Sequence, residues 1–195
     1  MPWQYTRRTD GKIAVSLDNN VWNLLFEKKL DLASQLPQDQ FVISITREIE
    51  IETLAIPDYP SKTALKDYIA RTIDDCHIRT TSVFGFAREG PGPQRFGGFE
   101  QGTWQSQTEQ EFYAAISEQY LLGKSEKNSQ LTDNEADATV AAKSFFSIVL
   151  TCELPKTTGP LRFAAEHGGK ILYLRDFDQS GLTLRAYIEA FHNQK

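Results

Sequence analysis

Four short apolar segments, rich in strand-favouring residues, recur along the chain and are separated by segments with helical spacing. They are KIAVSL (12–17), FVISI (41–45), SIVLT (147–151) and KILYL (170–174). Strands that alternate with helices favour a parallel sheet with helices packed on both of its faces. A segment as uniformly apolar as SIVLT fits a strand that is buried on both faces. The predicted fold is therefore α/β: a three-layer α/β/α sandwich around a central, mostly parallel sheet.

The segments between these strands predict the helical layers. Apolar residues at helical spacing, with charged residues on the opposite side, indicate amphipathic helices. Ser106 with Glu109, and Thr132 with Glu135, have the spacing of capping boxes, which mark helix starts. We expect helices over 21–36, from Thr46 through TREIEIETLAI, over 61–75, from about 106 to 123, over 133–146, over 161–167 and over 182–191.

The length of 195 residues suits one compact domain with a sizeable core. We expect a single domain over 1–195, with 1–11 as an N-terminal extension and 85–130 as an insertion. Residues 78–87 are expected to be extended. The window from Gly85 to Gly102 holds six of the twelve glycines and is expected to be a long loop. Loops of that length in compact domains usually serve a function or move.

Composition narrows the class of protein and its location. The sequence contains no run of about 18 apolar residues, the length needed to cross a membrane, and its N-terminus lacks a secretory signal pattern. Two cysteines are too few for a disulfide framework, which favours a reducing cytoplasm. The formal net charge is -5, so a nucleic-acid partner would have to meet a local basic patch.

Carboxylates follow the predicted strands at the positions where parallel sheets bind ligands, beyond the carboxyl ends. Unpaired carboxylates brought together repel each other, and a divalent cation relieves the repulsion. Hard oxygen ligands suit Mg²⁺ or Mn²⁺. The acids in question are Asp18 after the first strand, Glu48, Glu50 and Glu52 after the second, Asp133, Glu135 and Asp137 before SIVLT, and Glu153 after it.

The order of these acids resembles the PIN domain family of metal-dependent ribonucleases. The resemblance rests on VSLDNNVW (15–22), ISITREIEIE (43–52), DATVAA (137–142) and IVLTCE (148–153). The middle Asn of Asp18-Asn19-Asn20 and the Glu at 153 depart from the family pattern. The resemblance implies that the metal ligands and catalytic residues are Asp18, Glu50, Asp137 and Glu153, with Glu48 and Asp133 as alternatives.

The same resemblance implies an Mg²⁺- or Mn²⁺-dependent endoribonuclease, in which water activated by the metal attacks an RNA phosphodiester. RNA is then the expected partner. An antitoxin-like protein partner and a homodimer are left open. The alternative function is a PIN-like module with weak or no catalysis that binds RNA or protein, and the departures at Asn19 and Glu153 motivate it.

Simpler roles compete with the functional ones. Asp18 could cap the helix that follows it, and Glu135 is explained by the capping box with Thr132. In the glycine-rich loop, Arg88 and Arg95 lie among aromatic residues that could grip RNA by charge and stacking. Those aromatic residues could equally pack onto the domain or onto a second subunit.

Overall fold

The centre of the protein is a five-stranded sheet in which all neighbouring strands are parallel. The computed structural model describes residues 3–81, 83–84, 96–97, 106–121, 131–132, 134–155 and 158–194. The strand order is β3-β2-β1-β6-β7, and the predicted α/β fold with a parallel sheet is confirmed. The strands are β1 (Ile13–Leu17), β2 (Phe41–Thr46), β3 (Arg79–Thr81), β6 (Ile148–Thr151) and β7 (Ile171–Tyr173); a separate parallel pair consists of β4 (Val83–Phe84) and β5 (Phe96–Gly97).

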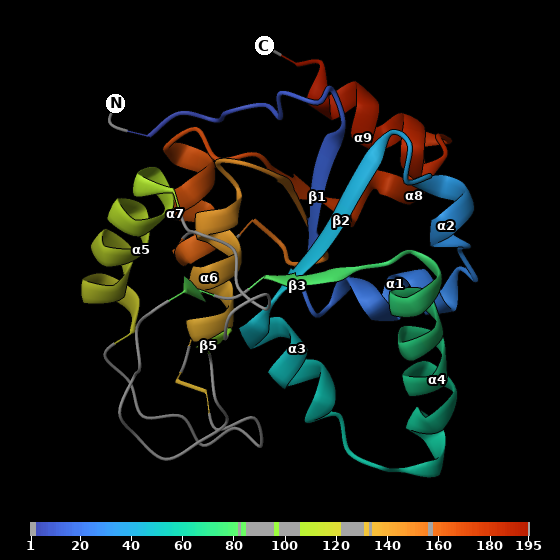
Figure 1. Ribbon diagram of the computed structural model, residues 1–195. Helices are drawn as coiled ribbons and strands as arrows, with labels where there is room; N and C mark the ends of the chain where they lie inside the picture. Colours follow the sequence, from blue (N-terminus) through green and yellow to red (C-terminus); the bar gives the residue numbers. More distant parts are fainter. Residues whose placement is uncertain are drawn as a thin grey trace.

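Helices cover the sheet on both sides and complete three layers (Figure 1). One side carries α5, α6 and α7, and the other carries α1, α2 and α4. None of the helices in the described part of the chain combines the length and apolar character needed to cross a bilayer. The helices are α1 (Val21–Glu27), α2 (Leu32–Gln35), α3 (Arg47–Leu54), α4 (Pro60–Asp75), α5 (Gln107–Tyr120), α6 (Glu135–Lys143), α7 (Pro160–Glu166), α8 (Phe177–Ser180) and α9 (Leu184–His192).

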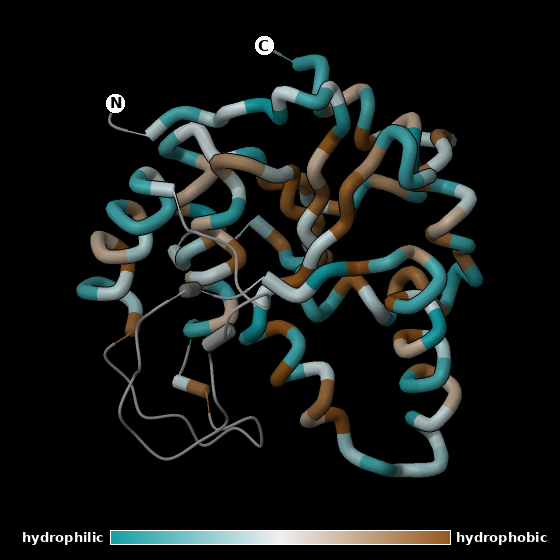
Figure 2. The backbone as a smooth tube through the Cα atoms, viewed as in Figure 1, coloured by the Kyte–Doolittle hydropathy of each residue, from teal (hydrophilic) through white to brown (hydrophobic). Residues whose placement is uncertain are grey.

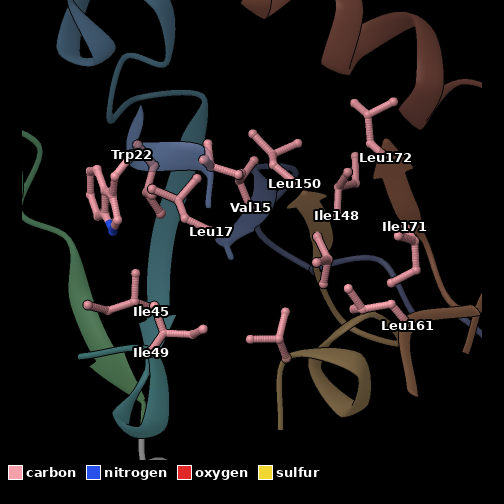
Figure 3. Close-up of a cluster of buried hydrophobic side chains, with 14 of the residues drawn as sticks. Val15, Leu17, Trp22, Ile45, Ile49, Ile148, Leu150, Leu161, Ile171 and Leu172 are labelled. Atoms are coloured by element: carbon pink, nitrogen blue, oxygen red, sulfur yellow. The ribbon is translucent and has the colours of Figure 1, made fainter. Parts of the chain in front are cut away.

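The hydrophobic core lies between the sheet and its two helical layers. The tube in Figure 2 is most hydrophobic along the central strands and more hydrophilic on the outer helices. Side chains of β1 and β6, among them Val15, Leu17 and Leu150, lie close together in the middle of the sheet (Figure 3) and are fully buried. All four residues of β6 are buried, as expected for a strand with helices on both faces.

The prediction of a single helix over 21–36 is wrong, because the segment forms two helices. α1 ends at Glu27, and Lys29 adopts a left-handed backbone conformation with φ of 51°. The side chain of Asp31 then accepts hydrogen bonds from the backbone N–H groups of Ala33 and Ser34 and starts α2. Leu25 in α1 and Leu32 in α2 are both buried, so the two short helices together bury apolar residues that the single expected helix would have buried.

The other expected helices form, with shifted ends. Thr46 caps α3 by accepting a hydrogen bond from the N–H of Ile49, and Pro60 takes a first-turn position in α4. The helix expected over 133–146 is shorter, since α6 runs from Glu135 to Lys143. The short α8 and the 3₁₀ turn before it were not predicted.

The expected insertion at 85–130 contains α5, and α5 is part of the core. Ser106 and Glu109 form the predicted capping box, and Phe112 and Ile116 are fully buried. The Trp3 ring meets the Phe112 ring edge-on, with ring centroids 5.1 Å apart. The helix therefore contributes to the packed layer that contains α6.

The strand order places two strands at the point where the chain reverses direction across the sheet. From β1 the chain continues to β2 and β3 on one side, whereas β6 pairs with β1 on the other side and leads to β7. Open parallel sheets bind ligands in the crevice beyond the carboxyl ends of such a pair of strands. The residues directly after β1 and β6 are therefore placed for function.

Candidate functional site

Asp18 lies directly after β1 and is only 4% exposed to solvent. Its backbone N–H donates to the carbonyl oxygen of Leu150 in β6, with an N···O distance of 3.0 Å. This bond extends the pairing of the two strands to the edge of the sheet. The side chain is therefore fixed where both strands end, and it does not accept a capping hydrogen bond from α1.

Three hydrogen bonds hold the Asp18 carboxylate. One oxygen accepts from the backbone N–H of Asn19 at 2.7 Å, and the other accepts from the Asn20 side-chain amide and the Thr151 hydroxyl, each at 2.7 Å. The side-chain Oδ1 atom of Asn20 in turn accepts from the backbone N–H of Cys152 at 2.7 Å. Asn20 therefore connects the turn after β1 to the segment after β6.

Burial raises the pKa of Asp18 to about 7 because the charged form loses its hydration. The hydrogen bond from Thr151 acts in the opposite direction, and repulsion from the carboxylates of Asp137 and Glu153 raises the pKa further. Two acids from other elements thus lie close enough to influence Asp18. The convergence of Asp18, Asp137 and Glu153 follows from the switch between β1 and β6, with α6 facing the same edge.

Asp137 and Glu153 also share a pocket of about 140 Å³. Asp137 lies in the first turn of α6, and Glu153 follows β6. The Glu153 backbone N–H donates to the Thr151 hydroxyl oxygen at 3.0 Å, which fixes the chain at this point. The remaining described residues that line the pocket are Tyr120, Asn134, Thr158, Gly159, Pro160, Leu161, Arg162 and Tyr173.

The acids of α3 are placed differently. Glu50 forms an ion pair with Arg47 one turn earlier on the same helix. Glu48 is buried, and Glu52 is half-buried. Among the described residues that line the pocket with Asp137 and Glu153, none of these three glutamates occurs. The α3 helix meets the site through Thr53, whose hydroxyl donates to the Asn19 side chain at 3.1 Å.

Other predicted residues fall into two groups. Glu135 accepts hydrogen bonds from the backbone N–H and the hydroxyl of Thr132 at 2.9 and 2.8 Å. The expected capping box is only half formed, because α6 begins at Glu135 itself and its N-cap is Asn134, without a side-chain cap hydrogen bond. Asp133, Arg88 and Arg95 lie outside the described residues.

The pocket offers carboxylate oxygens as donors for the expected divalent cation. Within the described ranges, no three His, Cys, Asp or Glu side chains are arranged to enclose a metal ion. Mg²⁺ rarely needs such a cage, since it usually keeps several waters and binds one or two carboxylates together with a substrate phosphate. Asp137 and Glu153 line one pocket and supply two hard oxygen donors. Carboxylate oxygens of this kind are the donors that a hydrated Mg²⁺ or Mn²⁺ ion uses.

Several residues of this site could not be found from the pattern of acids. Thr151 and Asn20 hold the Asp18 carboxylate, while Arg162 and Tyr173 line the pocket beside Glu153. Tyr173 is the last residue of β7, so the rule that ligands gather beyond strand ends does reach it. Arg162 has no comparable sequence signal, because its place depends on how α7 packs.

Comparison with known proteins identifies no relative. No protein-family model, no curated protein and no solved structure matches the chain.

Proposed function

We propose that the acidic pocket at the switch between β1 and β6 is the active site of a metal-dependent endoribonuclease of PIN type. One observation carries this proposal: carboxylates from three separate elements, Asp18, Asp137 and Glu153, come together at this edge of the sheet. Clustered carboxylates destabilise a protein unless a cation or a proton compensates them. A cluster built from elements far apart in the sequence is therefore better explained by function than by stability.

Asp137 and Glu153 would hold an Mg²⁺ or Mn²⁺ ion, because both line the pocket. Such an ion supplies charge compensation for a phosphate and makes water more acidic. Asp18 lies deeper, where hydrogen bonds from Asn20 and Thr151 fix its carboxylate. Its role would be to orient the site and to hold a proton or release it. Glu50 is kept as a candidate ligand from the family resemblance, although its side chain pairs with Arg47.

The proposed location remains the cytoplasm, where RNA is abundant and thiols stay reduced. Cys76 and Cys152 are both free thiols, which agrees with a reducing compartment.

The experiment is a cleavage assay on a mixed pool of single-stranded RNA with Mn²⁺ or Mg²⁺, and with a chelator as control. Cleavage is expected only when the metal is present. Wild-type protein is compared with Asp137→Asn, which nearly preserves the side-chain volume and removes one charge. No cleavage by freshly purified wild-type protein under any metal condition would exclude the nuclease.

A binding module without catalysis is the second candidate. One observation favours it: Asn19 and Glu153 both depart from the pattern of the catalytic family. This candidate predicts RNA binding with equal affinity in wild type and Asp137→Asn, and cleavage in neither. The two functions therefore separate in one set of samples when binding and cleavage are both measured.

A further inference from the structure

The hydroxyl oxygen of Tyr173 is buried and has no hydrogen-bond partner among the described residues. Tyr173 ends β7 and lines the same pocket as Asp137 and Glu153. A buried hydroxyl without a partner destabilises a folded protein, whereas phenylalanine would fill the same space without that cost. Because Tyr173 also lines the pocket, its buried hydroxyl without a partner points to a ligand that supplies one.

Arg162 places a positive charge on the same pocket. It lies in the first turn of α7, and its Nε donates to Glu166 one turn later at 2.7 Å. Both side chains of this pair are about half exposed to solvent, and the bond uses one of the five N–H donors of the guanidinium. Within the described ranges, the terminal nitrogens of Arg162 make no further hydrogen bond. A guanidinium at this position suits an oxyanion such as phosphate.

Size and charge limit what the pocket can take. Its volume of about 140 Å³ has room for roughly five water molecules. Pockets that enclose drug-sized molecules are larger, about 300–1,000 Å³, so a base with its sugar does not fit inside. Among the described residues that line it, the charged side chains are the carboxylates of Asp137 and Glu153 and the guanidinium of Arg162. A phosphate alone is therefore repelled, while a phosphate that enters with a divalent cation is not.

We infer that Arg162 and Tyr173 form the phosphate-binding wall of this pocket and hold the backbone of an RNA strand, with the bases outside, only when a divalent cation is bound opposite them. The choice of RNA as ligand rests on the proposed function. The recognition itself requires only a phosphate and a cation. Contacts to the backbone carry no sequence information, so this part of the site does not discriminate between bases.

The test uses uridine 5′-monophosphate as probe, because an endonuclease cannot cleave it. Binding is followed by NMR shifts in the presence of Mg²⁺ or of a chelator, with uridine as the control that lacks phosphate. The variants are Tyr173→Phe and Arg162→Gln. Matched controls are Tyr187→Phe and Arg185→Gln, since Arg185 pairs with Glu189 at the same spacing on another helix.

Wild-type protein is expected to bind uridine 5′-monophosphate in the presence of Mg²⁺ and to bind it far more weakly in chelator. It should also bind uridine far more weakly than the nucleotide. Each pocket variant should weaken binding roughly 10-fold or more, because a hydrogen bond to a charged group is lost. The control variants should bind as wild type does. Thermal stability of Tyr173→Phe should equal or exceed that of wild type, which a structural role for the hydroxyl would not give.

The inference is overturned if wild type binds no nucleotide with Mg²⁺, or if Tyr173→Phe and Arg162→Gln both bind it with unchanged affinity. RNA cleavage is measured on the same samples. Undiminished metal-dependent cleavage in both variants, with unchanged nucleotide affinity, refutes the phosphate wall and leaves the nuclease standing. Nucleotide binding that needs Mg²⁺ and both side chains, without RNA cleavage, supports the phosphate wall and refutes the nuclease.

Discussion

The hydroxyl of Thr151 donates a hydrogen bond of 2.7 Å to the carboxylate of Asp18, although the two residues lie 133 positions apart in the chain. Each residue belongs to the carboxyl end of one of the two central strands. The bond favours the charged form of Asp18, which burial disfavours more strongly. The carboxyl group is thus held in a balance that a change of pH or of one neighbour will shift.

The first prediction concerns the pH dependence of stability without metal. The pKa of Asp18 is about 7 in the folded protein, above the usual 3.8. At pH values between these two pKa values, Asp18 is more protonated in the folded state than in the unfolded state. This group therefore makes the free energy of unfolding fall as pH rises from about 4 to about 7. The slope is at most about 1.4 kcal/mol per pH unit.

Asp18→Asn removes this titration and the repulsion from Asp137 and Glu153. Its stability in chelator should equal or exceed that of wild type at pH 8, and the difference should vanish or reverse near pH 5. Urea unfolding at several pH values measures both curves, with Asp176→Asn as the exposed control. A large loss of stability at pH 8 would show that Asp18 serves chiefly as a hydrogen-bond partner.

The second prediction tests the partner of Asp18. Thr151→Val keeps the shape of a fully buried side chain but removes its hydroxyl. The variant should lose about 1–3 kcal/mol at pH 8, because the Asp18 carboxylate loses a donor. The loss should shrink near pH 5, where Asp18 is protonated. Thr72→Val, a buried threonine on α4, should show no such pH dependence; an equal pH dependence there would contradict the assignment.

The third prediction concerns activity. Asp137→Asn should reduce metal-dependent RNA cleavage on the order of 10²-fold or more, since metal stabilisation of a transition state supplies several kcal/mol. RNA binding should persist, because the grip on phosphates comes from cationic side chains. Initial rates over a range of Mn²⁺ concentrations give the effect, with Asp39→Asn on the surface as control. Cleavage that survives in Asp137→Asn unchanged would place the chemistry elsewhere.

The fourth prediction concerns a close contact beside β7. A Cβ atom on Gly169 would lie 2.1 Å from the Ser144 hydroxyl oxygen and 3.0 Å from the Ala164 carbonyl oxygen. Gly169→Ala should therefore cost about 1–3 kcal/mol of stability, measured by urea unfolding. The same change should cost less when Ser144 is already alanine. Equal costs in both backgrounds would show that the Ala164 backbone causes the clash.

The fifth prediction concerns the ion pair that joins α5 to α6. The Lys143 Nζ atom lies 2.9 Å from the Glu109 Oε1 atom, and the two side chains are only 15% and 6% exposed. Lys143→Met should destabilise the protein by about 3 kcal/mol, because it leaves a buried carboxylate without its cation. The double variant with Glu109→Gln should recover most of the loss and keep the cap on Ser106. Chemical denaturation of the four proteins completes the cycle, and purely additive losses would contradict the pairing.

The four apolar strands could be predicted from the sequence to within a residue at their ends because their signals are local, whereas β5 lies in the window expected to be a loop. Segments such as SIVLT are almost entirely apolar, and the acidic residues that follow them can be identified directly in the sequence. Topology then brings Asp18 and Glu153 to one edge without further information. The approach of Asp137 follows as well, since α6 packs between neighbouring helices and above β1 and β6.

The rest depends on geometry that no local pattern contains. The break between α1 and α2 requires Lys29 to adopt a left-handed backbone conformation. The residues around Lys29 favour helix, so the sequence gives no sign of this break. Whether Glu48 or Glu50 faces the site depends on helix phase, which shifts with each residue at the helix start. Arg162 and Tyr173 come together only after α7 and β7 have packed, so spacing alone could not pair them.

The central pairing of β1 with β6 has a consequence for biosynthesis. Ser16 and Ser147, which share a hydrogen bond across these strands, are 131 positions apart. The N-terminal part of a chain leaves the ribosome first, so β1 and β2 emerge long before the strand that closes the middle of the sheet. Glu153, Arg162 and Tyr173 arrive later still. A nascent chain that lacks these residues therefore carries no assembled pocket, and any reaction that the pocket performs begins only after Tyr173 has left the ribosome.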